Sequence, residues 1–487
     1  MIYPSLKEVK KITTNQDYKV VPISMELYSD IKTPIETLKI LKGISTNVFI
    51  LESVDSTNKM GRYTFLGYDP KLELTCYNHK LKITTGTTIE EEVKHPNEYI
   101  RKILKENKSP RISGMPTFTG GLVGYFSYDY GREQMEVPSG EEELVKIPEA
   151  VWTFYDCFII EDRNEKKTYL VANGITNDAW KQICEMEENI LKLWKDAETY
   201  MYSEDADDIT IKKVYEIKVH SNFEKEPYKR AISQMIRYII EGDIYIANMT
   251  RHLMIESDKP PLKVFYDLRK NNPSPFGAYM DLGEYQIVCA SPERFLKMKD
   301  HHVTTRPIKG TRKRGCTPEE DAQLRQELQQ SEKDKSELLM IVDLERNDLN
   351  RVCKPGSVKV TELFTVEEYA TVFHLVSNIK GELEEEKNAM DLLEAAFPGG
   401  SITGAPKYRA MEIIDELEHG KRNLYTGSIG YLTLDGSFDL NIVIRTALHK
   451  DGRYYLGVGG GITAESELEF EYEETMQKAK AILDALQ

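Results

Sequence analysis

The chain has 487 residues, of which 40% are hydrophobic and 30% are charged. This composition supports a packed core and excludes global disorder. Lysine and arginine number 64 against 80 aspartate and glutamate residues, which gives a formal net charge of −16. So acidic a surface repels nucleic acids and anionic membranes, and we expect neither as a partner. An anionic substrate would need a local group of cations or a metal ion.

The 6 cysteines are spread along the chain, and none forms a C-x-x-C pair. This spacing argues against a disulfide framework or a zinc site and favours a reducing compartment. The N-terminal residues contain no apolar signal core, and no apolar run reaches the roughly 18 residues of a membrane-spanning helix. We therefore expect a cytoplasmic protein.

The N-terminal part of the chain is rich in short strand patterns, at 47–52, at 63–67 and in the glycine-rich segment 120–126. The acidic stretch 200–212 is the least core-like part of the sequence and predicts a linker. We therefore expect an N-terminal lobe over residues 1–200 and a C-terminal domain over residues 213–487.

The C-terminal part mixes strands with helices. Helical patterns cover 227–241, 318–340, 407–417 and 466–486; Gly242 suits the end of the first, and Thr317 the N-cap of the second. Strand patterns at 440–445 and 454–458 lie between them. The whole pattern predicts an α+β protein with large, mostly antiparallel β-sheets and flanking helices.

Two of these helices carry carboxylates at helical spacing. Glu471, Glu474 and Lys478 share one face of the last helix, and Asp334 and Glu337 share a face of another. If both helices faced one cavity, their oxygens would suit Mg²⁺. The same spacing also fits an ordinary solvated helix surface, and the residues alone leave both interpretations open.

Lys309 and Glu293 are candidates for catalysis. Lys309 lies in the segment Arg306-Pro-Ile-Lys-Gly-Thr-Arg312, and nearby cations would favour its neutral, nucleophilic form. Glu293 could act as a general acid. The alternatives are a basic loop without a ligand and a surface pair between Glu293 and Arg294.

Three further features are weaker signals. Gly459, Gly460 and Gly461 follow a strand and could present backbone N–H groups to a carboxylate, or form a plain turn. Arg445 is expected to meet an anion, because a buried guanidinium without a partner is costly. His374, among apolar residues, is also compatible with a satisfied core position.

Taken together, these segments resemble the chorismate-utilising enzymes, from about residue 47 to the C-terminus. The motifs that carry the resemblance are 242–245, 272–275, 291–295, 307–311, 340–349, 374–377, 397–407 and 444–446. The resemblance implies a chorismate-binding enzyme fold, with residues 213–487 as the catalytic domain. It also implies chorismate and ammonia as substrates and Mg²⁺ as the cofactor.

The resemblance implies roles for individual residues as well. It assigns Lys309, Glu293 and His374 to catalysis, and Glu337 and Glu474, with Asp334 and Glu471 beside them, to Mg²⁺. The substrate-binding residues that it implies are Gly310, Thr311, Tyr425, Arg445, Gly459, Gly460, Gly461 and Lys478.

Lys309 indicates which member of this family the chain resembles. Anthranilate synthases usually carry a small residue at this place, whereas aminodeoxychorismate synthases carry lysine. By this resemblance the lysine attacks the chorismate ring with Glu293 as the acid, and ammonia then displaces it. The implied function is aminodeoxychorismate synthase component I, whose product, 4-amino-4-deoxychorismate, leads to 4-aminobenzoate and folate. The alternative is anthranilate synthase component I of tryptophan biosynthesis.

No Cys-His glutaminase module is recognisable, so we expect ammonia from a separate glutamine amidotransferase subunit. Ile246 stands where amino-adding relatives usually have glutamine, and it cannot act as a base. Relatives bind tryptophan at a place that matches Ser53 and 272–274 here. The residues of this candidate site are Ser53, Asn272, Pro273 and Ser274, and whether tryptophan binds them stays open.

Overall fold

The structure, a computed structural model, describes residues 2–15, 18, 20–28, 31–53, 61–78, 80–92, 96–137, 143–175, 178–204, 214–369 and 372–487. Within these ranges the strands form one sheet of 13 strands and one of 12, and the paired strands run antiparallel. The α+β class with large antiparallel sheets is therefore confirmed.

Each sheet combines strands from both halves of the chain. The first sheet runs in the order β1 (Ile2–Tyr3), β2 (Ile23–Leu27), β11 (Lys167–Ala172), β10 (Cys157–Asp162), β4 (Tyr63–Gly67), β3 (Asn47–Glu52), β14 (Phe276–Leu282), β15 (Tyr285–Ser291), β24 (Thr446–Lys450), β25 (Arg453–Ile462), β13 (Ile246–Glu256) and β12 (Lys218–Ser221), with β21 (Gly404–Ala405) beside β13. The second runs β18 (Ile308–Lys313), β20 (Val372–Glu382), β17 (His302–Arg306), β16 (Arg294–Lys299), β23 (Phe438–Asn441), β22 (Ser428–Thr433), β8 (Gly121–Phe126), β9 (Ala150–Tyr155), β5 (Leu72–Tyr77), β6 (Lys80–Thr85) and β7 (Thr88–Glu92), with β19 (Lys359–Glu368) beside β20.

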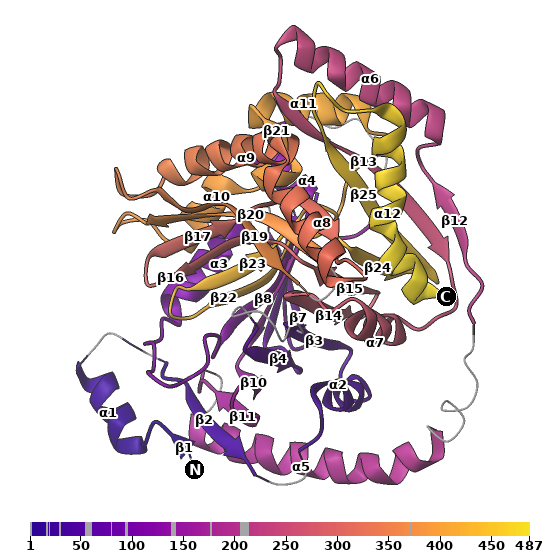
Figure 1. Cartoon of the computed structure of the whole chain (residues 1–487). Helices are drawn as coiled ribbons and strands as arrows, with labels where there is room; N and C mark the ends of the chain where they lie inside the picture. Colours follow the sequence, from indigo (N-terminus) through magenta and orange to yellow (C-terminus); the bar gives the residue numbers. More distant parts are fainter. Residues whose placement is uncertain are drawn as a thin grey trace.

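Helices cover the sheets (Figure 1). Those on the first sheet include α2 (Pro34–Lys42), α5 (Ala179–Glu204), α6 (Lys225–Glu241), α7 (Pro261–Asn271) and α12 (Leu468–Leu486). The second sheet contacts α3 (Pro96–Glu106), α8 (Pro318–Gln330) and α9 (Glu332–Asn350). The remaining helices are α1 (Leu6–Asn15), α4 (Tyr128–Gln134), α10 (Ala389–Ala396), α11 (Lys407–Leu417) and the short 3₁₀ turn η1 (Gly400–Ile402). No helix in the described ranges is long and apolar enough to cross a membrane.

An aromatic core holds the sheets together. Phe49 and Phe158 belong to the first sheet, and Tyr155 to the second. The rings of Phe49 and Tyr155 meet edge to face with centroids 4.8 Å apart, and Phe158 packs in the same way on Phe118 at 4.6 Å. Such edge-to-face pairs stabilise beyond the burial of apolar area. The same hydrophobic cluster includes Tyr285 and Leu448, so the core joins N-terminal and C-terminal segments.

The expected boundary between two domains stays a prediction. Helix α5 ends at Glu204, and residues 205–212 of the expected linker lie outside the described ranges. Strands from both sides of residue 200 pair directly, as β3 does with β14.

Two local predictions were wrong. The helical pattern over 318–340 is two helices, because the Ser331 hydroxyl accepts a hydrogen bond from Asp334 N at 3.3 Å and starts α9. The strand expected over 440–445 ends at Asn441. Arg445 instead lies in a bend with φ of 48° and is not on a strand.

Other boundaries were predicted correctly. Helix α6 ends at Gly242, whose φ of 89° lies in the left-handed region that glycine adopts without strain. Thr317 caps α8 by accepting a hydrogen bond from Glu320 N, and Pro318 occupies the first turn. Helix α11 covers the whole of the predicted segment 407–417.

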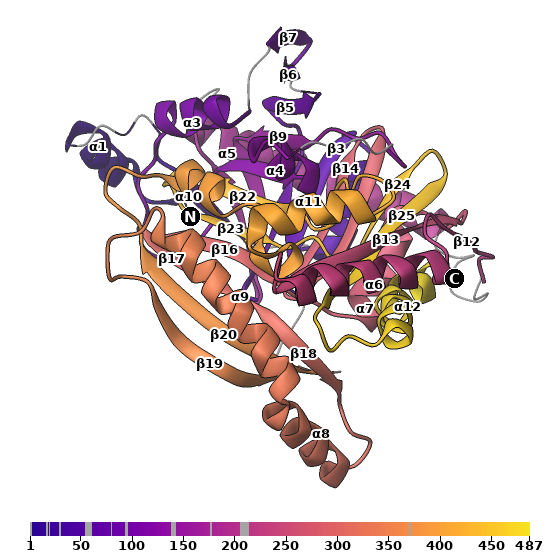
Figure 2. The same ribbon diagram turned by 90° about the horizontal axis from the view of Figure 1, so that it is seen from above.

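The ends of the two sheets meet near the C-terminal helix. Strand β18 is an outer strand of the second sheet, and β25 and β13 lie near the edge of the first. Helix α9 packs on β18 and β20, while α12 packs on β25. Figure 2 shows α8, β18 and β19 projecting from the body of the molecule. The region between β18 and β25 is where the predicted site residues gather.

Candidate active site

A cavity of about 740 Å³ lies between β18, α9, β25 and α12. All the residues predicted as catalytic, substrate-binding or metal-binding line it: Glu293, Lys309, Gly310, Thr311, Asp334, Glu337, His374, Tyr425, Arg445, Gly459, Gly460, Gly461, Glu471, Glu474 and Lys478. Residues 185 positions apart in sequence, from Glu293 to Lys478 (478 − 293 = 185), thus share one cavity.

Glycines on β25 let side chains approach the strand from both faces. A Cβ on Gly461 would lie 3.3 Å from the Lys309 Nζ. On the opposite face, a Cβ on Gly460 would lie 3.1 Å from an oxygen of Glu474 and 3.2 Å from an oxygen of Glu471. Any larger residue would therefore occupy space beside these functional groups.

Lys309, Arg445 and Lys478 are among the cations that line the cavity. The Lys309 ammonium donates to the Ser401 carbonyl at 3.3 Å. The Lys478 ammonium donates to the Gly459 carbonyl at 2.7 Å and lies 3.1 Å from Glu474. Arg445 forms no ion pair within the described part of the chain, and burial lowers its pKa. Lys309 and Arg445, which have no ion-pair partner in the described part of the chain, are therefore the cations that could meet an anion in the cavity.

Two carboxylates of α12 lie next to each other on the Gly460 side. Glu471 is buried; one of its oxygens accepts a hydrogen bond from the Ser466 hydroxyl at 2.7 Å, and the other has no partner. Burial raises the pKa of Glu471 to about 7. Burial alone would also raise the pKa of Glu474, but the Lys478 ammonium outweighs it and lowers that pKa.

These carboxylates fit a divalent cation in part. Among the described residues, no group of three or more His, Cys, Asp or Glu side chains is arranged to hold a metal ion. Asp334 is engaged elsewhere, since it lies 3.1 Å from the Arg312 guanidinium. The unpartnered Glu471 oxygen beside Glu474 nevertheless suits Mg²⁺, which commonly takes one or two protein carboxylates and completes its shell with substrate and water.

Two further carboxylates face Lys309. Burial raises the pKa of Glu293, and the Lys309 ammonium partly opposes this shift. Burial likewise raises the pKa of Glu337, and Lys309 again opposes it. Glu293 can therefore hold a proton at a higher pH than an exposed glutamate, which is what a general acid requires.

His374 is held neutral beside the cavity. Its Nδ1 and the Thr311 hydroxyl are 2.9 Å apart. Burial, together with the nearby Arg445 guanidinium, lowers the pKa of His374 to about 3. At neutral pH the imidazole therefore acts as a neutral hydrogen-bonding group.

The candidate tryptophan residues lie at the edge of this region. Asn272 lines the cavity, whereas Ser53, Pro273 and Ser274 are not among its lining residues. Ser53 and Ser274 are both buried, and the Ser53 hydroxyl has no hydrogen-bond partner in the described structure. Tryptophan binding stays a prediction.

Sequence reasoning missed several lining residues. Asn248 on β13, Ser401 in η1 and Gln477 on α12 all face the cavity. Gln477 follows Glu474 by three positions, so helical periodicity could have identified it. Ile246, noted from the sequence as an unusual residue, is buried, with its Cδ1 3.4 Å from the position of a Cβ on Gly461.

The antiparallel fold brings cations and carboxylates together in one large cavity, an arrangement typical of a site for a small ligand. A sequence model of the chorismate binding enzymes matches residues 47–484. The chain belongs to this family of chorismate binding enzymes, as the motifs indicate.

Characterised relatives cover the whole chain. It is 39% identical over 497 aligned positions to anthranilate synthase component 1 of Acetivibrio thermocellus, covering 100% of this chain and 99% of the relative. It is 35% identical to the protein of the same name from Aquifex aeolicus, with 99% and 97% covered.

Solved structures agree on the fold. The crystal structure of anthranilate synthase component I from Streptococcus pneumoniae has a TM-score of 0.75 at 31% identity, covering 87% of this chain and 92% of that one. The menaquinone-specific isochorismate synthase of Escherichia coli, at 16% identity and a TM-score of 0.70, covers 99% and 98% and shares the fold.

We predict that His374 makes stability depend on pH. The folded protein keeps this imidazole neutral down to about pH 3, whereas the unfolded chain protonates it near 6.5. Below pH 6.5 the unfolded state binds more protons, so the free energy of unfolding falls as the pH falls. Urea denaturation at pH 7 and pH 5 should therefore show a smaller decrease in the free energy of unfolding for His374→Gln than for wild type. The difference between the two proteins should be up to about 1.4 kcal/mol per pH unit. Equal decreases in both proteins would contradict the buried, neutral imidazole.

Proposed function

We propose that this chain replaces a ring hydroxyl of chorismate with an amino group derived from ammonia. Chorismate carries two carboxylates, and the cations of Lys309, Arg445 and Lys478 all face one cavity of sufficient size. The observation that carries the proposal is that two of these cations, Lys309 and Arg445, face the cavity without an ion-pair partner among the described residues of a chain of net charge −16.

The names of the relatives favour anthranilate as the product. Relatives named anthranilate synthase component 1 match the chain at 34–39% identity over at least 94% of its length. We therefore take anthranilate synthase component I of tryptophan biosynthesis as the first candidate. It supersedes aminodeoxychorismate synthase component I, the first expectation from the sequence, as the better supported of the two.

In this proposal the residues divide between binding and proton transfer. Arg445 and Lys478, with Tyr425 and the N–H groups near Gly459 and Gly460, hold the enolpyruvyl carboxylate. Thr311, His374, Gly310 and Gly461 line the side of the ring and its carboxylate. Glu293, whose pKa burial raises, gives a proton to the departing hydroxyl so that it leaves as water while ammonia forms the new C–N bond to the ring. Loss of a ring proton and of the enolpyruvyl group as pyruvate then gives the aromatic ring of anthranilate.

Glu471 and Glu474, with Glu337, would hold Mg²⁺ in this site. The bound ion would neutralise substrate carboxylate charge and help to orient the ring. Burial raises the pKa of Glu471 although Lys333 and Lys478 oppose the shift, and a bound cation would oppose it further.

Lys309 favours a second candidate, aminodeoxychorismate synthase component I. Its ammonium reaches the cavity beside Glu293 and has no carboxylate within ion-pair distance in the described ranges. Once deprotonated, it would attack a ring carbon as the hydroxyl leaves. Ammonia would then form the new C–N bond and expel the lysine amine, keeping the enolpyruvyl group.

Both candidates use ammonia, which we propose comes from a separate glutamine amidotransferase subunit in the cytoplasm. Hydrolysis of glutamine needs an activated nucleophile, usually a cysteine. Cys76, Cys289 and Cys353 are buried, and burial raises the pKa of each thiol. Such thiols are poor nucleophiles.

The product decides between the candidates. Purified chain incubated with chorismate, ammonium and Mg²⁺ should form fluorescent anthranilate directly, and Lys309→Ala should still form it. Loss of one charged contact should raise the KM for chorismate in this variant by about tenfold. Mass spectrometry should identify the same product in both reactions.

The opposite result would establish the second candidate. In that case no fluorescence develops, 4-aminobenzoate appears only after a lyase is added, and Lys309→Ala loses the product. Replacing ammonium with glutamine serves as the control, since the isolated chain should then form no product.

We predict that Glu474→Gln lowers the affinity for Mg²⁺ with little change in folding. The substitution removes a charge and preserves shape at a half-exposed position. The Mg²⁺ concentration for half-maximal activity should rise at least about tenfold, while the melting temperature stays within roughly 2 °C. Glu473→Gln, one position away on the same helix, is the matched control. An unchanged Mg²⁺ requirement in Glu474→Gln would remove this residue from the proposed metal site.

A further inference from the structure

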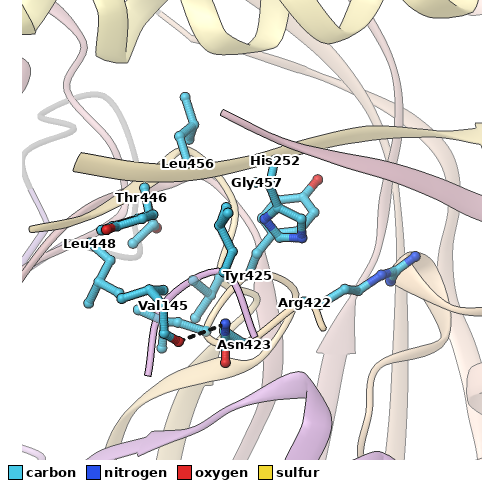
Figure 3. Close-up of a pocket in the computed structure, with 13 residues that line it drawn as sticks. Val145, His252, Arg422, Asn423, Tyr425, Thr446, Leu448, Leu456 and Gly457 are labelled. Carbon is cyan, nitrogen blue, oxygen red and sulfur yellow. Dashed lines mark hydrogen bonds between the residues drawn. The ribbon is translucent and has the colours of Figure 1, made fainter. Parts of the chain in front are cut away.

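The loop between α11 and β22, residues 418–427, connects the wall of the active-site cavity with the N-terminal part of the chain. Arg422 reaches the cavity side, where Tyr425 lines the cavity itself. Asn423 reaches the other side, and its side-chain amide donates to the Val145 carbonyl at 3.1 Å. Figure 3 shows Asn423 bonded to Val145, with Arg422 extending in another direction. The loop is therefore held from two sides.

Arg422 anchors the loop to the cavity wall. Its buried guanidinium donates to the Asn248 carbonyl on β13 and to the Ile402 carbonyl in η1, both at 2.7 Å. It also pairs with the Glu418 carboxylate at 2.6 Å. Asn248 and Ile402 both line the cavity. Because breaking a buried ion pair is strongly destabilising, this anchor is firm.

Tyr425 is the loop residue that enters the cavity. Its N–H donates to the Arg422 carbonyl at 3.1 Å, and its ring fills the place of a side chain at Gly457. A smaller cavity of about 30 Å³ also borders Tyr425. Since protein interiors are normally packed with few voids, neighbouring side chains do not fully enclose this residue. The position of Tyr425 therefore depends on how the loop is held.

Asp129 on α4 holds the loop from the N-terminal side. Its carboxylate accepts one hydrogen bond from Asn423 N at 2.7 Å and another from the Arg132 guanidinium at 3.2 Å. The Tyr128 N–H donates to the Asn423 carbonyl at 2.9 Å, so both backbone groups of Asn423 are bonded to α4. Asn423 has a φ of 51°, in the left-handed region that few residues other than glycine adopt. Helix α4 thus stabilises an uncommon backbone conformation two residues before Tyr425.

Asp129 is buried, with 3% of its surface exposed. Burial raises its pKa to about 6, although the Arg132 guanidinium and the Asn423 N–H oppose this shift. At about pH 8 the group is therefore ionised. Burial of a charge is costly unless the charge is paired and hydrogen-bonded, so the position of Asp129 depends on both of its donors.

We propose that Asp129 is a positioning residue for substrate binding, which acts through Asn423 to hold Tyr425 at the wall of the active-site cavity. Asp129 itself is not among the residues that line this cavity. Its carboxylate fixes the backbone of Asn423, and Arg422 fixes the adjacent residue, so the loop enters the cavity in one conformation. This inference rests on the proposed function, in which Tyr425 helps to hold the enolpyruvyl carboxylate of chorismate.

The test measures kcat and the KM for chorismate in Asp129→Ala, at about pH 8 with saturating ammonium and Mg²⁺. The variant loses the bond that holds Asn423, so its KM should rise about fivefold, as expected when one contact with the substrate weakens. The kcat should stay within about twofold of wild type, because a contact made equally in the ground and transition states affects only KM. Asp129→Asn keeps an oxygen that can accept the Asn423 N–H, and its KM should stay within about twofold of wild type.

A double-mutant cycle shows whether the effect passes through Tyr425. Tyr425→Phe removes the hydroxyl that would contact the carboxylate, so it should raise the KM by itself. If Asp129 acts by placing this hydroxyl, adding Asp129→Ala to Tyr425→Phe should raise the KM by less than about twofold further. A role confined to stability would lower the melting temperature of Asp129→Ala and leave its KM unchanged.

Asp156→Ala is the matched control. Asp156 is also buried, and it accepts hydrogen bonds from Ile175 N at 3.3 Å and from the Gln182 side chain at 2.7 Å. Neither of these donors lines the cavity. The KM for chorismate in Asp156→Ala should therefore equal that of wild type.

The proposal is overturned if the KM of Asp129→Ala equals that of the control, or if Asp129→Ala raises the KM as much in Tyr425→Phe as in wild type. If Asp129→Ala does not fold, Asn423→Gly is judged by the same two criteria. This variant keeps the left-handed backbone accessible and loses the bond to Val145. Failure of the proposed function looks different, because wild-type protein would then form no amino product.

Discussion

The absence of side chains at four positions of β25 is the constraint on which the active site depends. A Cβ on Gly459 would lie 2.3 Å from the Met249 carbonyl, and one on Gly457 would lie 2.1 Å from Cγ of Tyr425. These approaches exclude any other residue. Because these four positions carry no side chain, other groups can approach the backbone of β25. These groups are β13, Tyr425, Lys309 and the carboxylates of α12. Catalytic groups from distant parts of the sequence can thus share one cavity.

Electrostatics then determine what the cavity can bind. The chain as a whole is acidic, yet Lys309 and Arg445 lack carboxylate partners within ion-pair distance in the described structure. The carboxylates Glu293, Glu337 and Glu471 have raised pKa values because they are buried. Both features are costly in the free protein, and a dianionic substrate with a divalent cation would relieve both. We regard this complementarity as the physical basis of the proposed chemistry.

Local structure was largely predictable from the sequence, whereas its assembly was not. Gly242 and Thr317 marked helix ends correctly because caps depend on a few neighbouring residues. The break at Ser331 was missed because an amphipathic pattern continues across it. The pairing of β3 with β14 joins segments more than 200 residues apart, and no local pattern specifies such a register.

The site residues were predictable for a different reason. Spacing alone could not show whether Glu471 and Glu474 belong to a functional site or to an ordinary solvated helix face. Only their position along the chain relative to the other motifs of the family suggested a shared cavity. Asn248 gave no sequence signal, because its place beside the cavity depends on the pairing of β13 with β25. The bend at Arg445 was likewise hidden by its apolar neighbours.

The most direct test is a calorimetric titration of wild type and of Gly460→Ala with chorismate in the presence of Mg²⁺. It measures whether the glycine positions of β25 form part of the substrate site. The added methyl group would meet only the ends of the flexible side chains of Glu471, Glu474 and Lys478, so folding should be preserved. Our account predicts a melting temperature close to that of wild type and a Kd for chorismate at least about tenfold higher, because the methyl group displaces the carboxylates from the cavity. An unchanged Kd in a folded Gly460→Ala protein would contradict it.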